Sequence, residues 1–464
     1  MGEPKNSGSR GGPDLPGIAR LMSDAGAASL YLKYLAPNDN SKNQPYFGGS
    51  FDVLNMLPLA SELTVEGVNS SKASVGRDTR RLKASLDFYW LNSDGMASRA
   101  PGAQLILYPQ YPEVRFSGFL RGAEGAPSSL MQSEKRGRET GRVLFLGVTP
   151  DSRVLGYVAA PESAAAHDAL NLGLESDIGV FSTLDLPGLV GSEGNRTVLF
   201  RELRRIHQVG WIPAKSLDKD GAERQCRGTN CGGLTLEAEL GIRPNSRADP
   251  DFLGWEVKQH DVGTFDRPAH RAITLLTPNP DLGDYAEMPL TDFIQAYGYA
   301  DVRGRSGRLN FGGVHRAGQT HARTGLLLGF DGFDPGKPRR FDPEGALTLT
   351  NAQGDMAAAW SFAKLLGHWN RKHGHAVFVP SEKGQDNGSQ RYRYGREVGL
   401  GTGTDFIRLL NALSQGVVYF DPGMKLVRRE NSSFQTKGRS QFRVRSDMLE
   451  NLYAHWASED VLTC

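Results

Sequence analysis

The sequence predicts two domains, a mainly β domain followed by a mixed α/β domain. Three observations support this prediction. The chain has 464 residues, enough for two or three separate cores. Short apolar runs broken by turn residues fill the region from Pro37 to about Pro161, as in a small β barrel or sandwich. From Leu199 onward, helical and strand patterns mix without strict alternation, which is typical of a mixed α/β arrangement.

The composition narrows the function classes. The formal net charge is only +2, so any nucleic-acid-binding face must come from local clusters of basic residues. Three cysteines, Cys226, Cys231 and Cys464, predict free thiols in a reducing compartment, without a disulfide framework or a zinc site. No apolar run approaches the roughly 18 residues of a membrane span, and the N-terminus lacks a signal peptide's apolar core. We therefore expect a cytoplasmic protein with no membrane partner.

The N-terminal part begins with a Gly-, Ser- and Pro-rich lead, for which we expect disorder. The apolar pattern from Ile18 to Leu35 predicts one or two short helices before the β region. An alanine-rich and then glycine- and serine-punctuated stretch separates this part from the next. The predicted boundaries are residues 1–14 for the lead, 15–165 for the N-terminal domain, 166–197 for a linker and 198–464 for the C-terminal domain.

Two polar stretches of the N-terminal domain are candidates for DNA contact. Residues 37–50 are rich in Asn, and residues 77–83 hold four basic side chains in seven. Such residue types bind phosphates and base edges, although loops between strands are also commonly just solvated. The candidates are Lys42, Asn43, Gln44, Arg77, Arg80, Arg81 and Lys83.

The C-terminal domain opens with two predicted helices. Leu199, Leu203 and Ile206 share one face of a helix that Gly210 ends, and LTLEAELG is a second helix that Gly241 ends. Further elements follow in order. Strands are predicted at 272–277, 325–330, 347–350, 375–380 and 417–420, and helices at 356–372, 405–415 (capped by Asp405) and 446–456 (capped by Ser446).

The stretch Arg247–His260, RADPDFLGWEVKQH, carries the strongest chemical signal. Side chains alternate along a strand, so Glu256 and Lys258 would lie on one face, and Asp251 could reach the same point. Carboxylate oxygens suit Mg²⁺, which completes its shell with water and phosphate oxygens, and a lysine could orient or deprotonate the attacking water. Glu237 on the preceding helix would face the same pocket. The competing interpretation is a solvated strand with an incidental salt bridge.

The runs ELRRIHQVGW, GGLTLEAELGI, ADPDFLGWEVKQH and ITLLTPNP resemble the MvaI/BcnI family of Type II restriction endonucleases. In that family a G-x-T-[FL]-E-x-x-L helix precedes a PDF-x₂-[IW]-E-[IV]-K strand, within the PD-(D/E)xK fold shared with the nickase MutH. The similarity covers roughly residues 198–455 and aligns poorly between about 291 and 351. The family's helix glutamate falls on Glu237, its metal-binding acids on Asp251 and Glu256, and its lysine on Lys258.

The resemblance implies a mechanism and a set of partners. Mg²⁺, with Mn²⁺ as a substitute, would be held by Asp251, Glu256 and the Val257 carbonyl, and burial would lower the pKa of Lys258. The expected enzyme is a monomer that cuts double-stranded DNA at a short CC-N-GG-like site, leaves 5′-phosphate ends and works beside a cognate DNA methyltransferase. The run KYLAPNDNSKNQ is similar to the entry of the EcoRII effector domain, a DNA-binding pseudobarrel, so the first domain could bind a second site (Type IIE).

Basic and glycine-rich segments of the second domain are candidates for reading DNA, because arginine can bind guanine edges bidentately. The alternative is a set of solvated loops. The candidates are Arg303, Arg305, Arg308, Asn310, His315, Arg316, Arg391, Arg393, Arg428, Arg429, Lys437 and Arg439.

Two other functions stay open at this point. The same chemistry would suit a MutH-like nickase or an anti-phage effector nuclease of loose specificity. A DNA-binding protein that no longer cuts is the third hypothesis.

Overall fold

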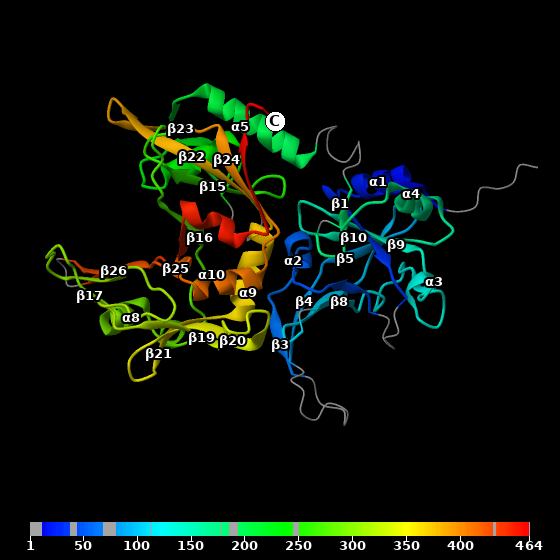
Figure 1. Cartoon of the computed structure of the whole chain (residues 1–464), viewed down its shortest axis with the longest axis horizontal. Helices are drawn as coiled ribbons and strands as arrows, with labels where there is room; N and C mark the ends of the chain where they lie inside the picture. The colour runs from blue at the N-terminus through cyan, green and yellow to red at the C-terminus, as the bar shows by residue number, and fades with distance from the viewer. Residues whose placement is uncertain are drawn as a thin grey trace, which may run out of the picture. The chain divides into compact units, whose positions relative to one another are not determined.

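The computed structural model describes residues 12–37, 44–67, 80–111, 113–176, 178–184, 194–244, 250–429 and 433–463. Two compact units make up the chain (Figure 1). The first holds residues 1–66, 81–108 and 112–194, and the second holds residues 67–80, 109–111 and 195–464. Most of the predicted disordered lead, and the candidates Lys42, Asn43 and Arg77, lie outside the described residues.

The first unit consists mainly of strands. One sheet has the order β11 (Ser182–Thr183), β1 (Ser29–Leu35), β9 (Arg142–Val148), β10 (Val154–Ala159), β5 (Phe88–Leu91) and β6 (Ala97–Arg99). The other has the order β2 (Tyr46–Gly48), β8 (Glu113–Ser117), β7 (Gln104–Tyr108), β4 (Arg81–Ser85) and β3 (Thr64–Glu66). Phe88 of the first sheet packs on Phe116 of the second, with ring centroids 5.0 Å apart.

Two segments of this unit differ from the prediction. The pattern expected as a second short helix is β1, in which Leu30 and Leu32 are buried alternately against α1 (Leu15–Asp24). The beginning of the expected linker is α4 (Ala164–Leu172), because Ser163 caps it and Ala165, Ala166 and Ala169 are buried in the same core. The alanine-rich composition of this segment suggests a linker. Alanine also favours helices, and because its alanines pack into the core, the segment is a buried helix.

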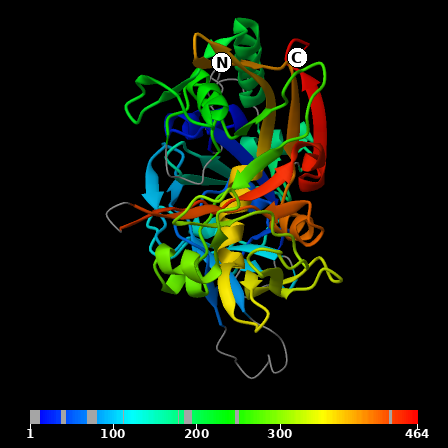
Figure 2. The same cartoon turned by 90° about the vertical axis from the view of Figure 1, so that its left-hand side faces the viewer.

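The second unit is built on a mixed sheet. Its strands follow the order β12 (Ile212–Pro213), β23 (Ser389–Tyr394), β22 (His375–Asp386), β24 (Glu397–Thr402) and β29 (His455–Asp460). The edge strand β29 is red in Figures 1 and 2. β15 (Glu256–Asp261) runs parallel to β22, with Lys258 opposite Phe378. β15 carries Glu256 and Lys258 of the RADPDFLGWEVKQH stretch.

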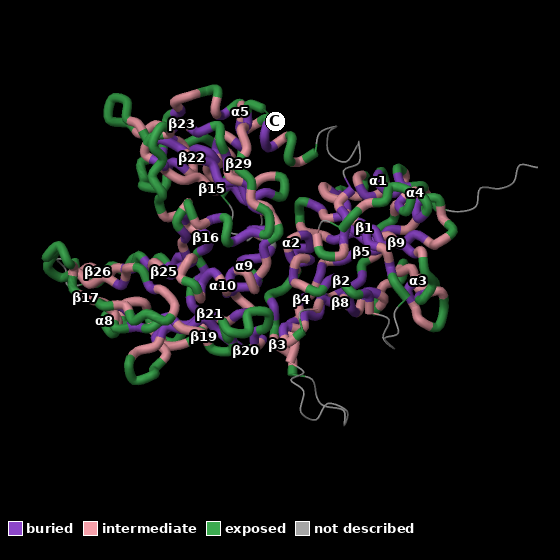
Figure 3. Tube along the Cα trace, viewed as in Figure 1, coloured by how far each residue is buried: buried purple, intermediate pink, exposed green. Residues whose placement is uncertain are grey.

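The predicted helices α5 (Asn195–Val209) and α6 (Cys231–Glu239) are confirmed and share one core with this sheet. Leu199, Leu203 and Ile206 are buried against Val257 and Val377, and Figure 3 shows buried stretches alternating with exposed and intermediate ones along α5. Gly210 and Gly241 follow the helices with φ of 76° and 72°, so their backbones take the left-handed form that ends a helix.

Smaller sheets and helices complete the unit. One three-stranded sheet holds β16 (Ala272–Leu276), β28 (Phe442–Arg445) and β25 (Val418–Phe420). A second three-stranded sheet holds β19 (Leu327–Phe333), β20 (Phe341–Thr350) and β21 (Met356–Ser361). A four-stranded sheet holds β17 (Tyr299–Ala300), β18 (Arg308–Gly312), β26 (Gly423–Arg428) and β27 (Phe434–Lys437). α8 (Leu290–Tyr297), α9 (Phe362–His373) and α10 (Phe406–Ser414) pack beside them.

Two helix predictions in this unit are wrong in part. The segment 356–372 begins as β21 and becomes helical only at Phe362, where the Ser361 hydroxyl caps α9 by accepting from the Lys364 amide. The segment 446–456 is a 3₁₀ helix, η1 (Ser446–Leu452), followed by β29. Alanine and apolar residues are compatible with both helix and strand. Because β21 pairs with β20 and β29 pairs with β24, both segments adopt the strand conformation. Asp405 caps α10 as predicted.

The cysteine prediction is also wrong. Cys226 and Cys231 form a disulfide, because the turn before α6 brings their Cα atoms within 5.7 Å.

In the part of the chain that the structure describes, no helix has both the length and the apolarity to cross a membrane.

Candidate active site

A minimal hairpin places the two acidic residues of the motif. Phe252 and Trp255 exchange backbone hydrogen bonds of 2.9 and 2.8 Å, and the two residues between them have positive φ, 49° at Leu253 and 86° at Gly254. Such a two-residue turn is the type I′ connection of hairpins. Asp251 and Glu256 flank it directly, and the Asp251 carboxylate accepts a 3.1 Å hydrogen bond from the Val257 amide. Asp251 is thereby fixed beside the first turn of β15.

Glu256 is the buried centre of the site, with a side chain that is 0% exposed. Its Oε1 pairs with the Lys258 ammonium and lies 3.4 Å from the Lys372 ammonium, while its Oε2 has no hydrogen-bond partner. Burial raises the pKa of Glu256 to about 7; Asp251 adds to this rise, and the two lysines oppose it. The Glu256 carboxyl can therefore give up its proton near neutral pH when a metal cation binds.

Glu237 of α6 belongs to the same cluster of charges. Burial raises the pKa of Glu237, the Asp251 carboxylate raises it further, and Lys258 and Lys372 act in the opposite direction. The helix carboxylate, the hairpin carboxylates and Lys258 therefore lie close enough to influence one another electrostatically.

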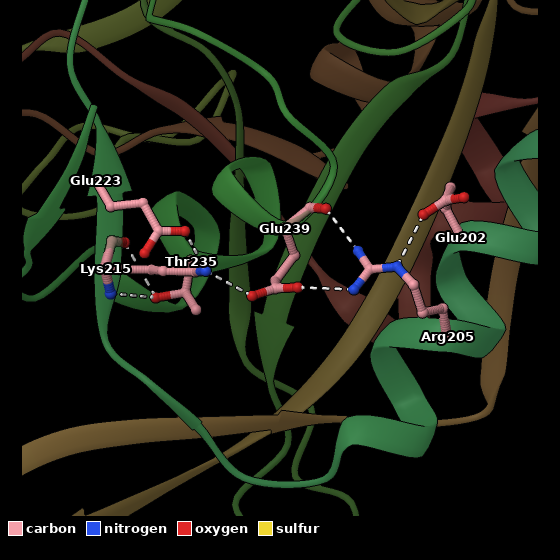
Figure 4. A network of polar contacts seen from close by, with 6 residues as sticks. All are labelled: Glu202, Arg205, Lys215, Glu223, Thr235 and Glu239. Atoms are coloured by element: carbon pink, nitrogen blue, oxygen red, sulfur yellow. Dashed lines mark hydrogen bonds and ion pairs between the residues drawn. The ribbon is translucent and has the colours of Figure 1, made fainter. Parts of the chain in front are cut away.

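A network of polar contacts holds α6 in place (Figure 4). The Glu239 carboxylate accepts from Lys215, at 2.8 Å, and from Arg205 of α5, at 3.1 Å. Thr235 exchanges hydrogen bonds with the backbone of Lys215, which starts β13 (Lys215–Leu217). Because Glu237 lies between Thr235 and Glu239, this clamp fixes the part of the helix that carries the site glutamate.

The expectation that burial lowers the pKa of Lys258 is wrong. Burial alone does push that pKa down, but the carboxylates of Glu256, Asp251 and Glu237 outweigh it, so the pKa of Lys258 is raised. Lys258 therefore stays an ammonium, with a side chain 19% exposed. A charged lysine can orient water and offset negative charge.

The donor set fits a hard divalent cation. Asp251 and Glu256 offer carboxylate oxygens, and the partnerless Oε2 of Glu256 is a buried acceptor that a cation could satisfy. Among the described residues, no three His, Cys, Asp or Glu side chains form a ready-made metal cage. Mg²⁺ commonly takes one or two carboxylates and keeps several waters.

Sequence reasoning missed three residues around Glu256. Lys372 and His373 come from the end of α9, and Tyr453 follows η1. Burial lowers the pKa of His373 well below its usual value, and the two lysines lower it further, so this histidine is neutral. Burial raises the pKa of Tyr453, with Glu256 adding to the effect. These segments lie far from the motif in sequence, so no local spacing signals them.

Two basic runs that were predicted separately form one sheet. Asn310 of β18 lies opposite Lys425 of β26, and Lys425 lies opposite Lys437 of β27. Arg303 and Arg305 line a hollow of about 440 Å³ beside these strands. The candidate DNA contacts that are exposed on the sheet and its connections are Arg303, Arg305, Arg428, Arg429, Lys437 and Arg439. Arg308 and Asn310 bond to each other and both contact Asp301.

Other DNA-contact candidates are engaged within the protein. His315 is buried, with ring nitrogens bonded to Gly313 and Thr324, so its prediction as a DNA contact is wrong. Burial lowers the pKa of His315 to about 4, and His321 adds to this. Arg316 lies over the Tyr419 ring, and Arg391 lies over Trp211. Arg393 also lies over Trp211 and pairs with Glu382 at 2.6 Å.

The described candidates of the 37–50 and 77–83 stretches also have protein partners. Gln44 donates to the Ser117 hydroxyl. Arg81 and Lys83 of β4 both pair with Glu66 of β3. Arg80, which clusters with the second unit, pairs with Asp342 at 2.7 Å.

The pKa of Glu256 gives a testable pH dependence of stability. Between about pH 4.5 and 7 the unfolded state ionises this carboxyl while the folded state keeps its proton, so the free energy of unfolding should fall as pH rises. Above about pH 7 this contribution should be constant. Melting temperatures in EDTA across that range should fall less steeply for Glu256→Gln, whose amide does not titrate. Parallel curves for the two proteins would contradict the assignment.

The chain matches a model of one protein family and resembles solved structures. The model of the MvaI/BcnI restriction endonuclease family matches residues 200–453. A solved structure of restriction endonuclease MvaI with its cognate DNA substrate is 18% identical, with a TM-score of 0.44 over 58% of this chain and 100% of that one. A structure of MvaI without DNA is 17% identical, with a TM-score of 0.32 over 57% of this chain and 98% of that one. No curated protein matches. The family match spans more than half of the chain, and the protein therefore belongs to the MvaI/BcnI restriction endonuclease family and is a site-specific deoxyribonuclease.

Proposed function

We propose that this protein is a Mg²⁺-dependent Type II restriction endonuclease that hydrolyses both strands of DNA at a short CC-N-GG-like site. The observation that carries the proposal is the hairpin that sets Asp251 and Glu256 on either side of one two-residue turn, with Lys258 against Glu256. This arrangement gathers hard oxygen donors and one ammonium at a single point, which metal-assisted phosphodiester hydrolysis requires.

The residues take distinct roles in this proposal. Asp251, Glu256 and the Val257 carbonyl hold the cation, which would polarise a phosphoryl oxygen and acidify a bound water. Lys258 stays protonated, orients the attacking water and offsets the charge that develops on the phosphate. Glu237 would complete a second metal position or tune Lys258, on which its charge acts. Mn²⁺ has the same preference for oxygen ligands and should support cleavage.

DNA contact is assigned to the sheet of β17, β18, β26 and β27. Replacing Arg428 and Lys437 together by Ala should weaken DNA binding and reduce the slope of log affinity against log salt by about 1 for each lost phosphate contact. Fluorescence anisotropy of a labelled duplex at several salt concentrations measures this slope. Lys219→Ala removes an exposed lysine from another loop and is the matched control. An unchanged slope in the double variant would remove these residues from the DNA interface.

The first unit is proposed to bind a second DNA site, as in a Type IIE enzyme. A short duplex that carries the recognition sequence, added in trans, should then accelerate cleavage of a plasmid with one site. We further propose that the protein acts as a monomer and that a DNA methyltransferase of the same system protects host sites. Light scattering at assay concentration tests the monomer, and cleavage of methylated against unmethylated plasmid tests the protection.

A plasmid assay tests the whole proposal. Purified protein with Mg²⁺ should convert plasmid DNA to discrete linear fragments, and EDTA should stop the reaction. Nicked circles or smears would favour a MutH-like nickase or a loosely specific effector nuclease. Intact plasmid that still shifts on a gel would favour a protein that only binds DNA. Sequencing of the cut ends would identify the recognition site.

A further inference from the structure

We propose that Lys372, at the end of α9, is a second catalytic lysine, which contacts the scissile phosphate together with Lys258. This inference rests on the proposed function and deepens it. It assigns a role to a residue that lies outside the PD-(D/E)xK motif and belongs to a different element of the fold.

The geometry places Lys372 at the reacting centre. Its ammonium lies 3.4 Å from Oε1 of Glu256, the oxygen that Lys258 also contacts. Glu256 is fully buried, whereas the Lys372 side chain is 26% exposed. Lys372 also acts electrostatically on Glu237 and His373. The Lys372 side chain is therefore partly open to the solvent from which a phosphate would approach.

A simpler explanation covers only part of this observation. Lys372 is in the last turn of α9, where a cation is favoured by the helix dipole. The dipole explains a basic residue at this position, but it does not explain why the ammonium reaches Glu256 on a separate strand. Glu256 already has Lys258 as a partner, and the Lys372 ammonium approaches the same oxygen.

The charges around Glu256 also indicate a use for the second lysine. Glu237, Asp251 and Glu256 carry three negative charges when ionised, and Lys258 and Lys372 carry two positive charges, with His373 neutral. This described set has one negative charge in excess. A divalent cation on the carboxylates would reverse that sign, and the single negative charge of a phosphodiester would then complete the balance. Without Lys372 the loaded site would have no excess positive charge for the phosphate.

In the chemical step Lys372 contacts the phosphate and transfers no proton. The water oxygen bonds to phosphorus and releases one proton to the surrounding water, while the bond from phosphorus to the 3′ oxygen breaks and that oxygen takes up a proton from water to become the 3′-hydroxyl. Negative charge builds up on the non-bridging oxygens during this step. The flexible four-carbon stem of lysine lets the ammonium move from Glu256 to one of these oxygens. The backbone of α9 stays fixed, because Trp369 anchors the helix through hydrogen bonds to Thr404 and Asp405.

Three variants and a control on the same helix test the proposal. Lys372→Ala, Lys372→Met and Lys372→Arg are compared with Lys364→Ala, two turns earlier in α9. Single-turnover cleavage with Mg²⁺ should slow by about a hundredfold or more in the Ala and Met variants, as when one preorganised charge donor is lost. The Arg variant should recover at least about tenfold of that loss, because it keeps the charge. Lys364→Ala should cut like the wild type.

A second readout is independent of cleavage. With Ca²⁺ in place of Mg²⁺, duplex binding by Lys372→Ala should show a salt slope smaller by about 1, because one phosphate contact is lost. Lys364→Ala should keep the wild-type slope. This measurement also decides the proposal if the wild type binds DNA without cutting it, in which case the proposed function fails separately.

Three results would overturn the proposal. One is cleavage by Lys372→Ala within about threefold of the wild type. Another is an Arg variant no faster than the Met variant, which would mean that Lys372 acts only through packing. The third is an unchanged salt slope in Ca²⁺. If Lys372→Ala does not fold, the comparison of the Arg and Met variants gives the answer.

Discussion

Asp251→Asn is expected to lower the rate of DNA cleavage by about three orders of magnitude, comparable to the loss of a major transition-state contact. The amide has the shape of the carboxylate, and its oxygen can still accept from the Val257 amide, so the hairpin should keep its geometry. The variant loses one negative charge and one anionic ligand, which a divalent cation requires. Plasmid cleavage under single-turnover conditions measures the change.

The matched control for this variant is Asp261→Asn on the same strand. Asp261 also accepts from a backbone amide, that of Gly263, and it pairs with the exposed Arg271. Its loss should change the cleavage rate less than about threefold, because exposed ion pairs contribute little. DNA binding by Asp251→Asn should remain within a few fold of the wild type. Cleavage by Asp251→Asn at the rate of Asp261→Asn would exclude Asp251 from the metal site.

Trp369→Ala should cost the second unit about 3–5 kcal/mol of its free energy of unfolding. Trp369 is fully buried on α9, stacks on His373 with centroids 4.3 Å apart and donates to the Thr404 hydroxyl and the Asp405 carbonyl. The substitution leaves a cavity and two unpaired acceptors beneath the helix that carries Lys372. Differential scanning fluorimetry should show a melting temperature lower by roughly 10 °C.

Trp369→Phe separates packing from hydrogen bonding. Phenylalanine keeps most of the buried ring and loses the indole N–H, so it should cost about 1–3 kcal/mol, the penalty for unpaired buried partners. A melting temperature for Trp369→Ala within about 2 °C of the wild type would contradict the anchoring role of this side chain.

The features that were predictable from sequence are those fixed by nearby residues. Helical period and stop signals located α5, α6 and α10, and the alternation of side chains brought Glu256 and Lys258 together. The paired carboxylates were found because a hairpin joins them within a few residues. The roles of Lys372, His373 and Tyr453 depend on which segments pack on β15, and that is decided by the whole fold.

Errors arose where tertiary pairing outweighs local preference. The run Met356–Ser361 has alanines that suit a helix, but it pairs with β20 and becomes a strand. His315 lies among glycines and arginines and looks exposed in sequence, yet it stacks on His321 inside the protein, with ring centroids 4.1 Å apart. The raised pKa of Lys258 also depends on tertiary structure, because the direction of its shift is set by how many carboxylates surround the ammonium.

The turn at Leu253 and Gly254 explains why the motif has its particular length. The four residues between Asp251 and Glu256 are the two turn residues and the pair that bridges them, the shortest loop that can close a hairpin. Adding or deleting one residue would shift the strand register and turn one carboxylate to the opposite face. The identity of Leu253 is far less constrained, since its side chain is 37% exposed and glycine or asparagine suits its positive φ better. In this protein, the number of residues between the two acids is therefore a structural requirement, while the residue at the tip of the turn is open to change.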